Sequence, residues 1–377
     1  MTIYLNNAAS GWPRAEGVCE AMTLTLQTPP FHPGRVAGGC ADVLTICRRG
    51  IAELVDAPDP TRIVLTTNAT HALNLAFWGV KLNDHAHVIT TVTEHNSVLR
   101  PLHHVRERFP GLRLTILPTN ATGALDEEQF DQALEREPTL VVINHASNVT
   151  GRVNEVEQLF QKAKKAGAMT LLDASQSLGS IPISVKKIQA DLIAFTGHKG
   201  LHGPAGTGAL YVNPSLELEQ VFVGGTGVRS DLMLHPANMP MRLEAGTPNM
   251  PSFAGLAAAL RWYQKEGAAH AQKATELANR FREALMNIPK VKVFDGTAKV
   301  CRTPVISIQI AGWAVEEIGY VLAESFGIIC RTGLHCAPLI HQAIGSAPEG
   351  TVRFSFSGFN TELEMETALD AVRRLAA

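Results

Sequence analysis

The chain of 377 residues has few cysteines, little net charge and no long hydrophobic run. Six cysteines are too few for a disulfide scaffold in a chain of this length, so we expect free thiols and a reducing, cytoplasmic environment. A formal net charge of −2, without a long run of one sign, argues against a protein that binds nucleic acid or a membrane surface. No apolar run approaches the roughly 18 residues of a membrane span, and the first residues lack a signal-peptide pattern.

The remaining composition is that of a globular protein with room for two domains. Hydrophobic residues make up 45% of the chain and charged residues 18%, as in ordinary globular proteins. A chain of 377 residues exceeds what one hydrophobic core usually serves. We expect a large domain of residues 14–262 and a small α+β domain made of residues 1–13 and 263–377. A helix predicted over residues 252–267, which continues in helical period, would connect the two.

Short apolar or β-branched runs alternate with helical patterns in the first two thirds of the chain. Seven of these runs are typical of buried strands, at residues 62–67, 87–91, 113–118, 140–145, 169–175, 191–197 and 208–212. Strands that alternate with helices predict an α/β fold with a mostly parallel, seven-stranded sheet covered on both faces. Ligands of such sheets bind at the carboxyl ends of the strands, so the polar residues that follow each run are the first candidates for a site.

Lys199 follows the predicted strand 191–197 in the glycine-rich stretch FTGHKGLHGPAGTGALYV. One interpretation is a solvated loop lysine. The other is a lysine that forms a Schiff base with a cofactor aldehyde, with glycines that let the backbone approach a ligand closely. The stretch lacks the G-x-x-x-x-G-K-[ST] pattern, so a nucleotide-binding P-loop is not indicated.

Asp173 ends a second predicted strand, in MTLLDASQS. A buried carboxylate needs a cationic partner, and a protonated pyridine nitrogen is one such partner. The alternative is a carboxylate that only caps the next turn. Gln176, one turn further along, is placed to bond a hydroxyl on the same ring.

Other polar residues also follow predicted strands. Thr70 lies near the start of a predicted helix, where free N–H groups can bind phosphate or where the threonine serves as a plain N-cap. Thr196 and His198, beside the lysine, would complete a phosphate site. His95 would stack on a flat ring, or have only a structural role. Asn148 is a further polar residue just past a strand.

The stretch RTGLHCAPLIH places Cys336 between His335 and His341. Three interpretations stay open: a metal site, a nucleophile, or a cysteine without a role. The thiolate is the nucleophilic form of cysteine. His335 and Arg331 are close in sequence and would favour that form.

Seven segments in this order resemble the cysteine desulfurases: YLNNAAS, EHNSV, SNVTG, DASQS, TGHKGLHGPAGTGALYV, EAGTPN and RTGLHCAP. These are enzymes of the class V aminotransferase group that use pyridoxal 5'-phosphate (PLP) and have fold type I. The ending, RTGLHCAP followed by TVRFSFSGFNT, is similar to group II, the SufS-like and selenocysteine lyase-like branch. The resemblance implies conversion of L-cysteine to L-alanine, with the sulfur transferred to Cys336 as a persulfide. It also implies a homodimer with shared active sites, a sulfur-acceptor protein and a place in iron–sulfur cluster biogenesis.

The resemblance implies roles at matching positions. Lys199, Cys336 and His95 would be catalytic, and Thr247 would come from the second subunit. Substrate would contact Asn148, Arg331 and Arg353, because a guanidinium pairs well with a carboxylate. The implied cofactor contacts are Thr70, His71, His95, Asn148, Asp173, Gln176, Thr196, His198, Lys199 and Thr247.

The sequence departs from the family pattern at Asn6, where Asp is usual, and at Leu334, where His is common. Selenocysteine lyase and ordinary aminotransferase activity are alternatives on the same fold. A metal-binding protein that uses His335, Cys336 and His341, with Cys330 in reach, is an alternative of another class. Its spacing matches none of the usual zinc patterns, so we expect no metal.

Overall fold

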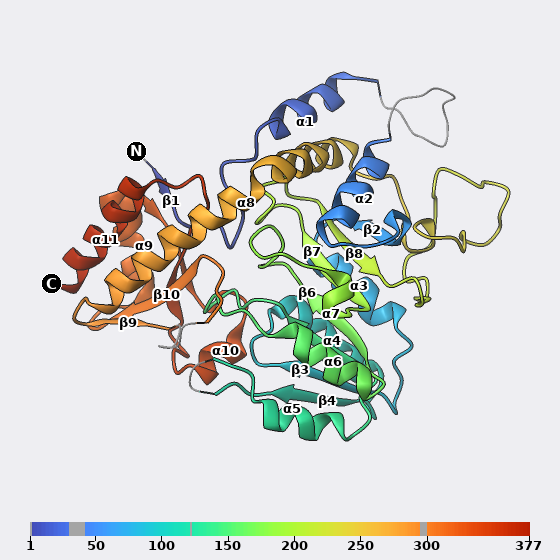
Figure 1. Ribbon diagram of the computed structural model, residues 1–377, viewed down its shortest axis with the longest axis horizontal. Helices are drawn as coiled ribbons and strands as arrows, with labels where there is room; N and C mark the ends of the chain where they lie inside the picture. Colours follow the sequence, from blue (N-terminus) through green and yellow to red (C-terminus); the bar gives the residue numbers. More distant parts are fainter. Residues whose placement is uncertain (1, 30–41, 121–122, 295–299) are drawn as a thin grey trace.

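The computed structural model describes residues 2–29, 42–120, 123–294 and 300–377 (Figure 1). Its centre is a seven-stranded sheet with the order β2-β8-β7-β6-β5-β3-β4. The two pairings of β8 are antiparallel and the others are parallel, which confirms the predicted, mostly parallel sheet. The strands are β2 (Ile63–Thr66), β3 (His87–Thr91), β4 (Arg113–Leu117), β5 (Leu140–Asn144), β6 (Met169–Asp173), β7 (Leu192–Thr196) and β8 (Gly208–Val212).

Helices cover both faces of this sheet, as expected for central strands that are buried at nearly every position. Alternate residues of a strand enter different cores: in β5, Val141 and Ile143 pack in one core, and Leu140 and Val142 in the other. The first core is completed by α2 (Val43–Leu54), α5 (Glu127–Leu134), α6 (Val156–Lys165), α7 (Val185–Ile188) and the start of α8 (Met250–Met286). The second is completed by α3 (Ala69–Gly79) and α4 (Asn96–Arg108).

A smaller unit contains the carboxyl-terminal part of the chain. Its four-stranded antiparallel sheet has the order β12-β13-β10-β9. The strands are β9 (Val291–Val293), β10 (Val305–Ile310), β12 (Arg331–Gly333) and β13 (Thr351–Ser355), and the helices are α9 (Val315–Phe326), α10 (Pro338–Ala343) and α11 (Glu362–Ala376). From the other end of the chain, β1 (Ile3–Tyr4) pairs in parallel with β11 (Ile328–Ile329). The division at residues 14 and 262 stays a prediction.

The long helix α8 joins the two units (Figure 1). Phe253 and Leu256, near its start, belong to a core of the large sheet, whereas Phe281 and Leu285, near its end, belong to the core of the small unit. The helix predicted from residue 252 onward is confirmed. The remaining elements are α1 (Val18–Gln27) and two short 3-10 helices, η1 (Pro60–Arg62) and η2 (Met241–Leu243).

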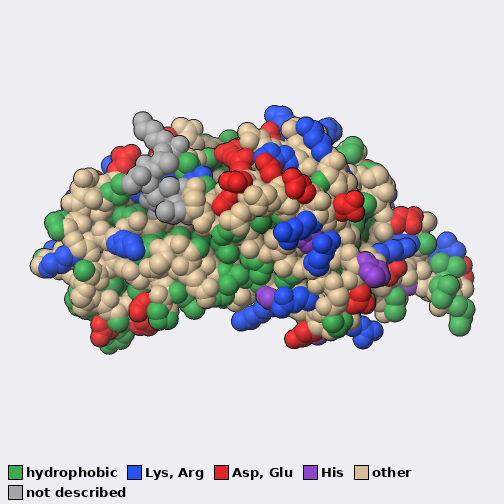
Figure 2. Space-filling view, turned by 90° about the horizontal axis from the view of Figure 1, so that it is seen from below, with side chains coloured by type: hydrophobic (Ala, Val, Ile, Leu, Met, Phe, Trp, Pro, Cys, Tyr) green, Lys and Arg blue, Asp and Glu red, His purple; other side chains and the backbone are tan. Residues whose placement is uncertain are grey.

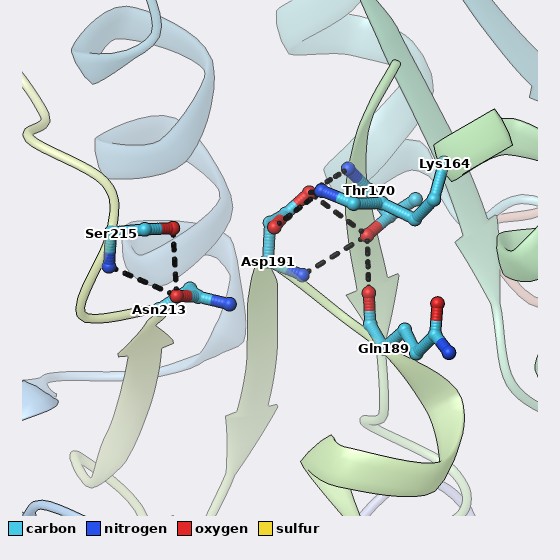
Figure 3. A network of polar contacts seen from close by, with 6 residues as sticks. All are labelled: Lys164, Thr170, Gln189, Asp191, Asn213 and Ser215. Carbon is cyan, nitrogen blue, oxygen red and sulfur yellow. Dashed lines mark hydrogen bonds and ion pairs between the residues drawn. The ribbon is translucent and has the colours of Figure 1, made fainter. Parts of the chain in front are cut away.

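A polar network fixes the amino ends of β6 and β7 (Figure 3). The buried carboxylate of Asp191 accepts a hydrogen bond of 2.9 Å from the Thr170 backbone N–H and one of 2.7 Å from Lys164 Nζ. Because the amino ends of these two strands are bonded together, their carboxyl ends, at Asp173 and Thr196, also have a fixed relative position. Among the described residues, no helix is long and apolar enough to cross a membrane.

Candidate active site

A cavity of about 230 Å³ lies at the carboxyl ends of β5, β6 and β7. This is the edge of the sheet that the strand pattern indicated for ligand binding. Most of the predicted site residues line it, namely Thr70, His95, Asn148, Asp173, Gln176, Thr196, His198, Lys199, Arg331 and Arg353. Residues far apart in the sequence therefore meet in one site.

Lys199 lies three residues after the end of β7 and is half-buried at the cavity wall. Burial lowers the pKa of its amine to about 8, against the opposing effect of the Asp173 charge. Its loop packs tightly on a neighbouring turn, since a Cβ at Gly200 would clash with the Leu178 carbonyl oxygen. With this pKa, roughly one tenth of the Lys199 amine is neutral at pH 7, far more than of an ordinary lysine, and the neutral form is the one that a nucleophilic amine requires.

Asp173 ends β6 and is 4% exposed. One carboxylate oxygen accepts a hydrogen bond of 2.9 Å from the Ser175 backbone N–H, so the residue caps the next turn and also faces the cavity. Both sequence interpretations of this residue are therefore compatible with its position. Within the described part of the chain Asp173 forms no salt bridge, so a cationic ligand group would relieve the cost of its burial.

His95 precedes α4 and caps its first turn. Its Nδ1 accepts a hydrogen bond of 3.0 Å from the Ser97 backbone N–H. Burial, aided by the Lys199 charge, lowers the pKa of His95 to about 4, so the ring is neutral near neutral pH. A neutral, flat ring at the cavity wall is suited to stacking on another flat ring.

The amino end of α3 also reaches the cavity, through Asn68 and Thr70. The N-cap is Asn68, whose side chain accepts a hydrogen bond of 2.9 Å from the His71 backbone N–H, so Thr70 lies inside the first turn. Sequence reasoning missed Asn68, although Asn directly before a helix is a common N-cap signal. The His71 side chain lies outside the cavity, with its ring 5.5 Å from that of Phe222. Thr247 is exposed and does not line the cavity.

Arg353 on β13 is the most deeply buried cation at the site, with 1% of its surface exposed. Its Nη1 donates 2.9 Å to the Asn148 carbonyl, whereas its Nε has no hydrogen-bond partner among the described residues. Burial and the nearby Arg331 lower the pKa of Arg353 to about 9. Asn148 Oδ1 likewise has no partner among the described residues. An anionic ligand would pair with this guanidinium.

Cys336 is half-exposed, and its Sγ lies 3.2 Å from Arg331 Nη2. Because Arg331 lines the cavity, the thiol lies beside the site. The expectation that His335 also favours the thiolate is not supported, since its Nε2 contacts Thr351 Oγ1 at 2.9 Å and burial lowers its pKa to about 2. The His335 ring is therefore uncharged and does not stabilise a Cys336 thiolate by its charge.

The His341 side chain also contacts a residue other than Cys336, since its Nδ1 lies 2.7 Å from Ser346 Oγ. Across the described ranges, no group of three or more His, Cys, Asp or Glu residues is placed to hold a metal ion.

Sequence reasoning also missed Glu94, which directly precedes His95 and is fully buried. Its Oε1 accepts hydrogen bonds from Thr91 Oγ1 (2.8 Å) and the Asn144 backbone N–H (2.9 Å), whereas Oε2 has no partner among the described residues. Burial, with a smaller contribution from the Asp173 charge, raises the pKa of Glu94 to about 8. Glu94 is therefore mostly a neutral acid at neutral pH.

Comparison with known proteins gives related sequences along the whole chain. A protein of Mycolicibacterium paratuberculosis described as "Probable cysteine desulfurase" is 34% identical over 90% of this chain, which spans half of that relative's length. A protein of Pyrococcus abyssi with the same description is 32% identical, over 87% of this chain and 82% of the relative.

Solved structures show the same fold. The structure of a cysteine desulfurase from Thermococcus onnurineus superposes with a TM-score of 0.89 at 30% identity, over all of this chain and 94% of the other. Residues 33–367 match the family described as Aminotransferase class-V. The chain therefore belongs to the class-V aminotransferase family.

Proposed function

We propose that the protein is a PLP-dependent cysteine desulfurase that converts L-cysteine to L-alanine and takes up the sulfur on Cys336 as a persulfide. The observation that carries this proposal is the position of the thiol. Cys336 contacts Arg331 at the edge of a cavity that also holds Lys199 and Asp173. An ordinary aminotransferase has no need of a thiol at that place.

The residues of the cavity fit PLP. Asp173 is a buried carboxylate without a salt bridge in the described part of the chain, which suits a protonated pyridine nitrogen. Lys199 would hold the cofactor covalently, and His95 would stack on the ring. Thr70, Thr196 and His198 would bind the phosphate at the amino end of α3, where free N–H groups point outward. When bound, PLP supplies an electron sink for the substrate carbon next to the amine.

Protein side chains would carry the remaining tasks. Lys199, with its pKa near 8, can both accept and return a proton close to neutral pH. Arg353 and Asn148 would bind the substrate carboxylate, using groups that have unpaired polar atoms. The Cys336 thiolate, beside Arg331, would attack the substrate sulfur: the new S–S bond forms, the C–S bond breaks, and the carbon takes the electron pair and a proton to become alanine.

The test is incubation of the purified, PLP-loaded protein with L-cysteine while alanine, sulfide and the cofactor absorbance are followed together. Cys336→Ala should keep the absorbance of the bound cofactor and lose sulfide release. The matched control is Cys301→Ala, because Cys301 is an exposed thiol outside the cavity. Full activity of Cys336→Ala on L-cysteine would refute the persulfide route.

The proposal includes a homodimer in which Thr247 reaches the phosphate of the partner subunit. The dimer is supported by the exposure of Thr247 and by residues 222–234, a segment that carries exposed hydrophobic side chains and projects from the large unit at the right of Figure 1. Val223, Met233 and Leu234 in this segment are 67%, 99% and 83% exposed. Hydrophobic side chains gather at the same end of the molecule in Figure 2. A second copy would cover them.

The cellular setting belongs to the same proposal. A persulfide on a half-exposed thiol calls for a sulfur-acceptor protein, and iron–sulfur cluster biogenesis in the cytoplasm is the setting that the family resemblance implies. Sedimentation of the protein at several concentrations tests the dimer.

A further inference from the structure

Cys336 lies on a turn with an unusual backbone. The turn Leu334–Ala337 is closed by a hydrogen bond of 2.9 Å from the Ala337 N–H to the Leu334 carbonyl. Its central residues, His335 and Cys336, have φ angles of 50° and 59°. Positive φ at both central positions is the pattern of type I′ turns, where Gly, Asn and Asp are usual. Larger L-residues are strained there, so the surrounding structure must hold them.

The large unit donates hydrogen bonds to the backbone carbonyl groups of both strained residues. Asn148 Nδ2 donates a hydrogen bond of 2.8 Å to the His335 carbonyl, and the Asn96 N–H donates one of 2.7 Å to the Cys336 carbonyl. Asn148 lines the cavity, and Asn96 directly follows His95, which also lines it. The cavity walls are therefore bonded to the turn that carries the thiol.

The small unit holds the side chains of the same turn. The His335 ring is 2% exposed and contacts Thr351 on β13 at 2.9 Å. The base of the turn is closely packed, since a Cβ at Gly350 would clash with the backbone of Gly333. The strained turn is thus fixed from two sides, by units that contact each other here.

We propose that Asn148 and Thr351 are positioning residues that keep this strained turn closed, with Cys336 at the cavity. Loss of either contact lets the turn relax and move the thiol away from Arg331. That this movement affects sulfur transfer rests on the proposed function. That Asn148 and Thr351 keep the turn closed does not depend on the proposed function. Asn148 then has a task besides the substrate contact, because one of its N–H groups is already bonded to the turn.

The rate of alkylation of Cys336 measures how often the turn opens. The PLP-loaded protein is treated with iodoacetamide at alkaline pH, and peptide mass spectrometry follows Cys336 separately from the exposed Cys19 and Cys301. In Asn148→Ala and in Thr351→Val we expect alkylation about fivefold faster, the factor that matches the net strength of one hydrogen bond. Thr351→Ser keeps the hydroxyl and should retain the rate of the unchanged protein.

A second control separates the turn from a general loss of a buried amide. Asn360 is 5% exposed and donates to the Tyr4 carbonyl at 3.1 Å, away from the turn, so Asn360→Ala should leave the alkylation rate unchanged. Unchanged rates in both Asn148→Ala and Thr351→Val, or equal rates in Thr351→Val and Thr351→Ser, would overturn the proposal. If Asn148→Ala does not fold, the Thr351 pair decides alone.

The effect on turnover tests the positioning role directly. Thr351 does not line the cavity, so Thr351→Val should lower kcat for alanine formation and leave KM for L-cysteine unchanged. A raised KM with an unchanged kcat would contradict the role. If the unchanged protein forms no alanine from L-cysteine, the proposed function fails, while the alkylation rates still report on the turn.

Discussion

Glu94 gives a prediction whose size follows from its burial. The side chain is fully buried and accepts two hydrogen bonds on one oxygen, and its pKa is raised to about 8 from an ordinary value of 4.5. The folded state therefore holds a proton that the unfolded chain loses above pH 4.5. The resulting stabilisation is complete below pH 4.5 and is lost as the pH rises through about 8.

The perturbation is Glu94→Gln, which keeps the shape of the acid and cannot ionise. With these two pKa values, linkage predicts that the free energy of unfolding of the unchanged protein falls by about 3–4 kcal/mol between pH 5 and pH 8, relative to the variant. The measurement is urea unfolding of both proteins at pH 5, 6.5 and 8, with the same PLP concentration throughout. The glutamine NH₂ group takes the place of Oε2, which has no hydrogen-bond partner among the described residues, so its buried N–H groups destabilise the variant by about 1–3 kcal/mol at every pH and do not change the slope.

The control is Glu128→Gln, which removes an exposed acid from α5. Its unfolding free energy should follow that of the unchanged protein at all three pH values. If Glu94→Gln also runs parallel to the unchanged protein, within about 0.5 kcal/mol, Glu94 is ionised in the folded state and the reasoning from its burial is wrong.

Further results are expected for four variants. Arg353→Leu should raise KM for L-cysteine more than it lowers kcat, because Arg353 would bind the substrate carboxylate; an unchanged KM in steady-state assays would exclude that contact. Arg48→Met should destabilise the fold by about 3–5 kcal/mol in urea, because it leaves the carboxylate of Glu244, bonded at 2.6 and 2.7 Å, without its largely buried partner. Lys186→Met, which removes an exposed pair, should leave the unfolding free energy nearly unchanged. Lys199→Ala should abolish the covalent attachment of PLP, which borohydride reduction and mass spectrometry would detect.

The central sheet could be predicted because its signal is local. All seven β-branched or apolar runs form strands, and Asp173 and Lys199 follow two of them in one cavity. The carboxyl ends of parallel strands meet at one edge, so residues distant in sequence could be placed together without knowledge of side-chain contacts.

The orientation of His335 could not be predicted, because it depends on long-range structure. A residue next to Cys336 in sequence was expected to act on the thiol. The positive φ angles of the turn and the pairing of β12 with β13 direct its ring to Thr351 instead. Glu94 was missed for a similar reason, since nothing in EHNSV reveals that an acid is enclosed without a basic partner.

The unbroken helix α8 has a mechanical consequence for the whole molecule. A helix of 37 residues is roughly 55 Å long, and its two ends are embedded in different hydrophobic cores. Because one continuous helix packs in both cores, we expect the two cores to change their relative orientation little. Movement of Cys336 away from the cavity would then require the turn Leu334–Ala337 to open, while the two cores keep their relative position.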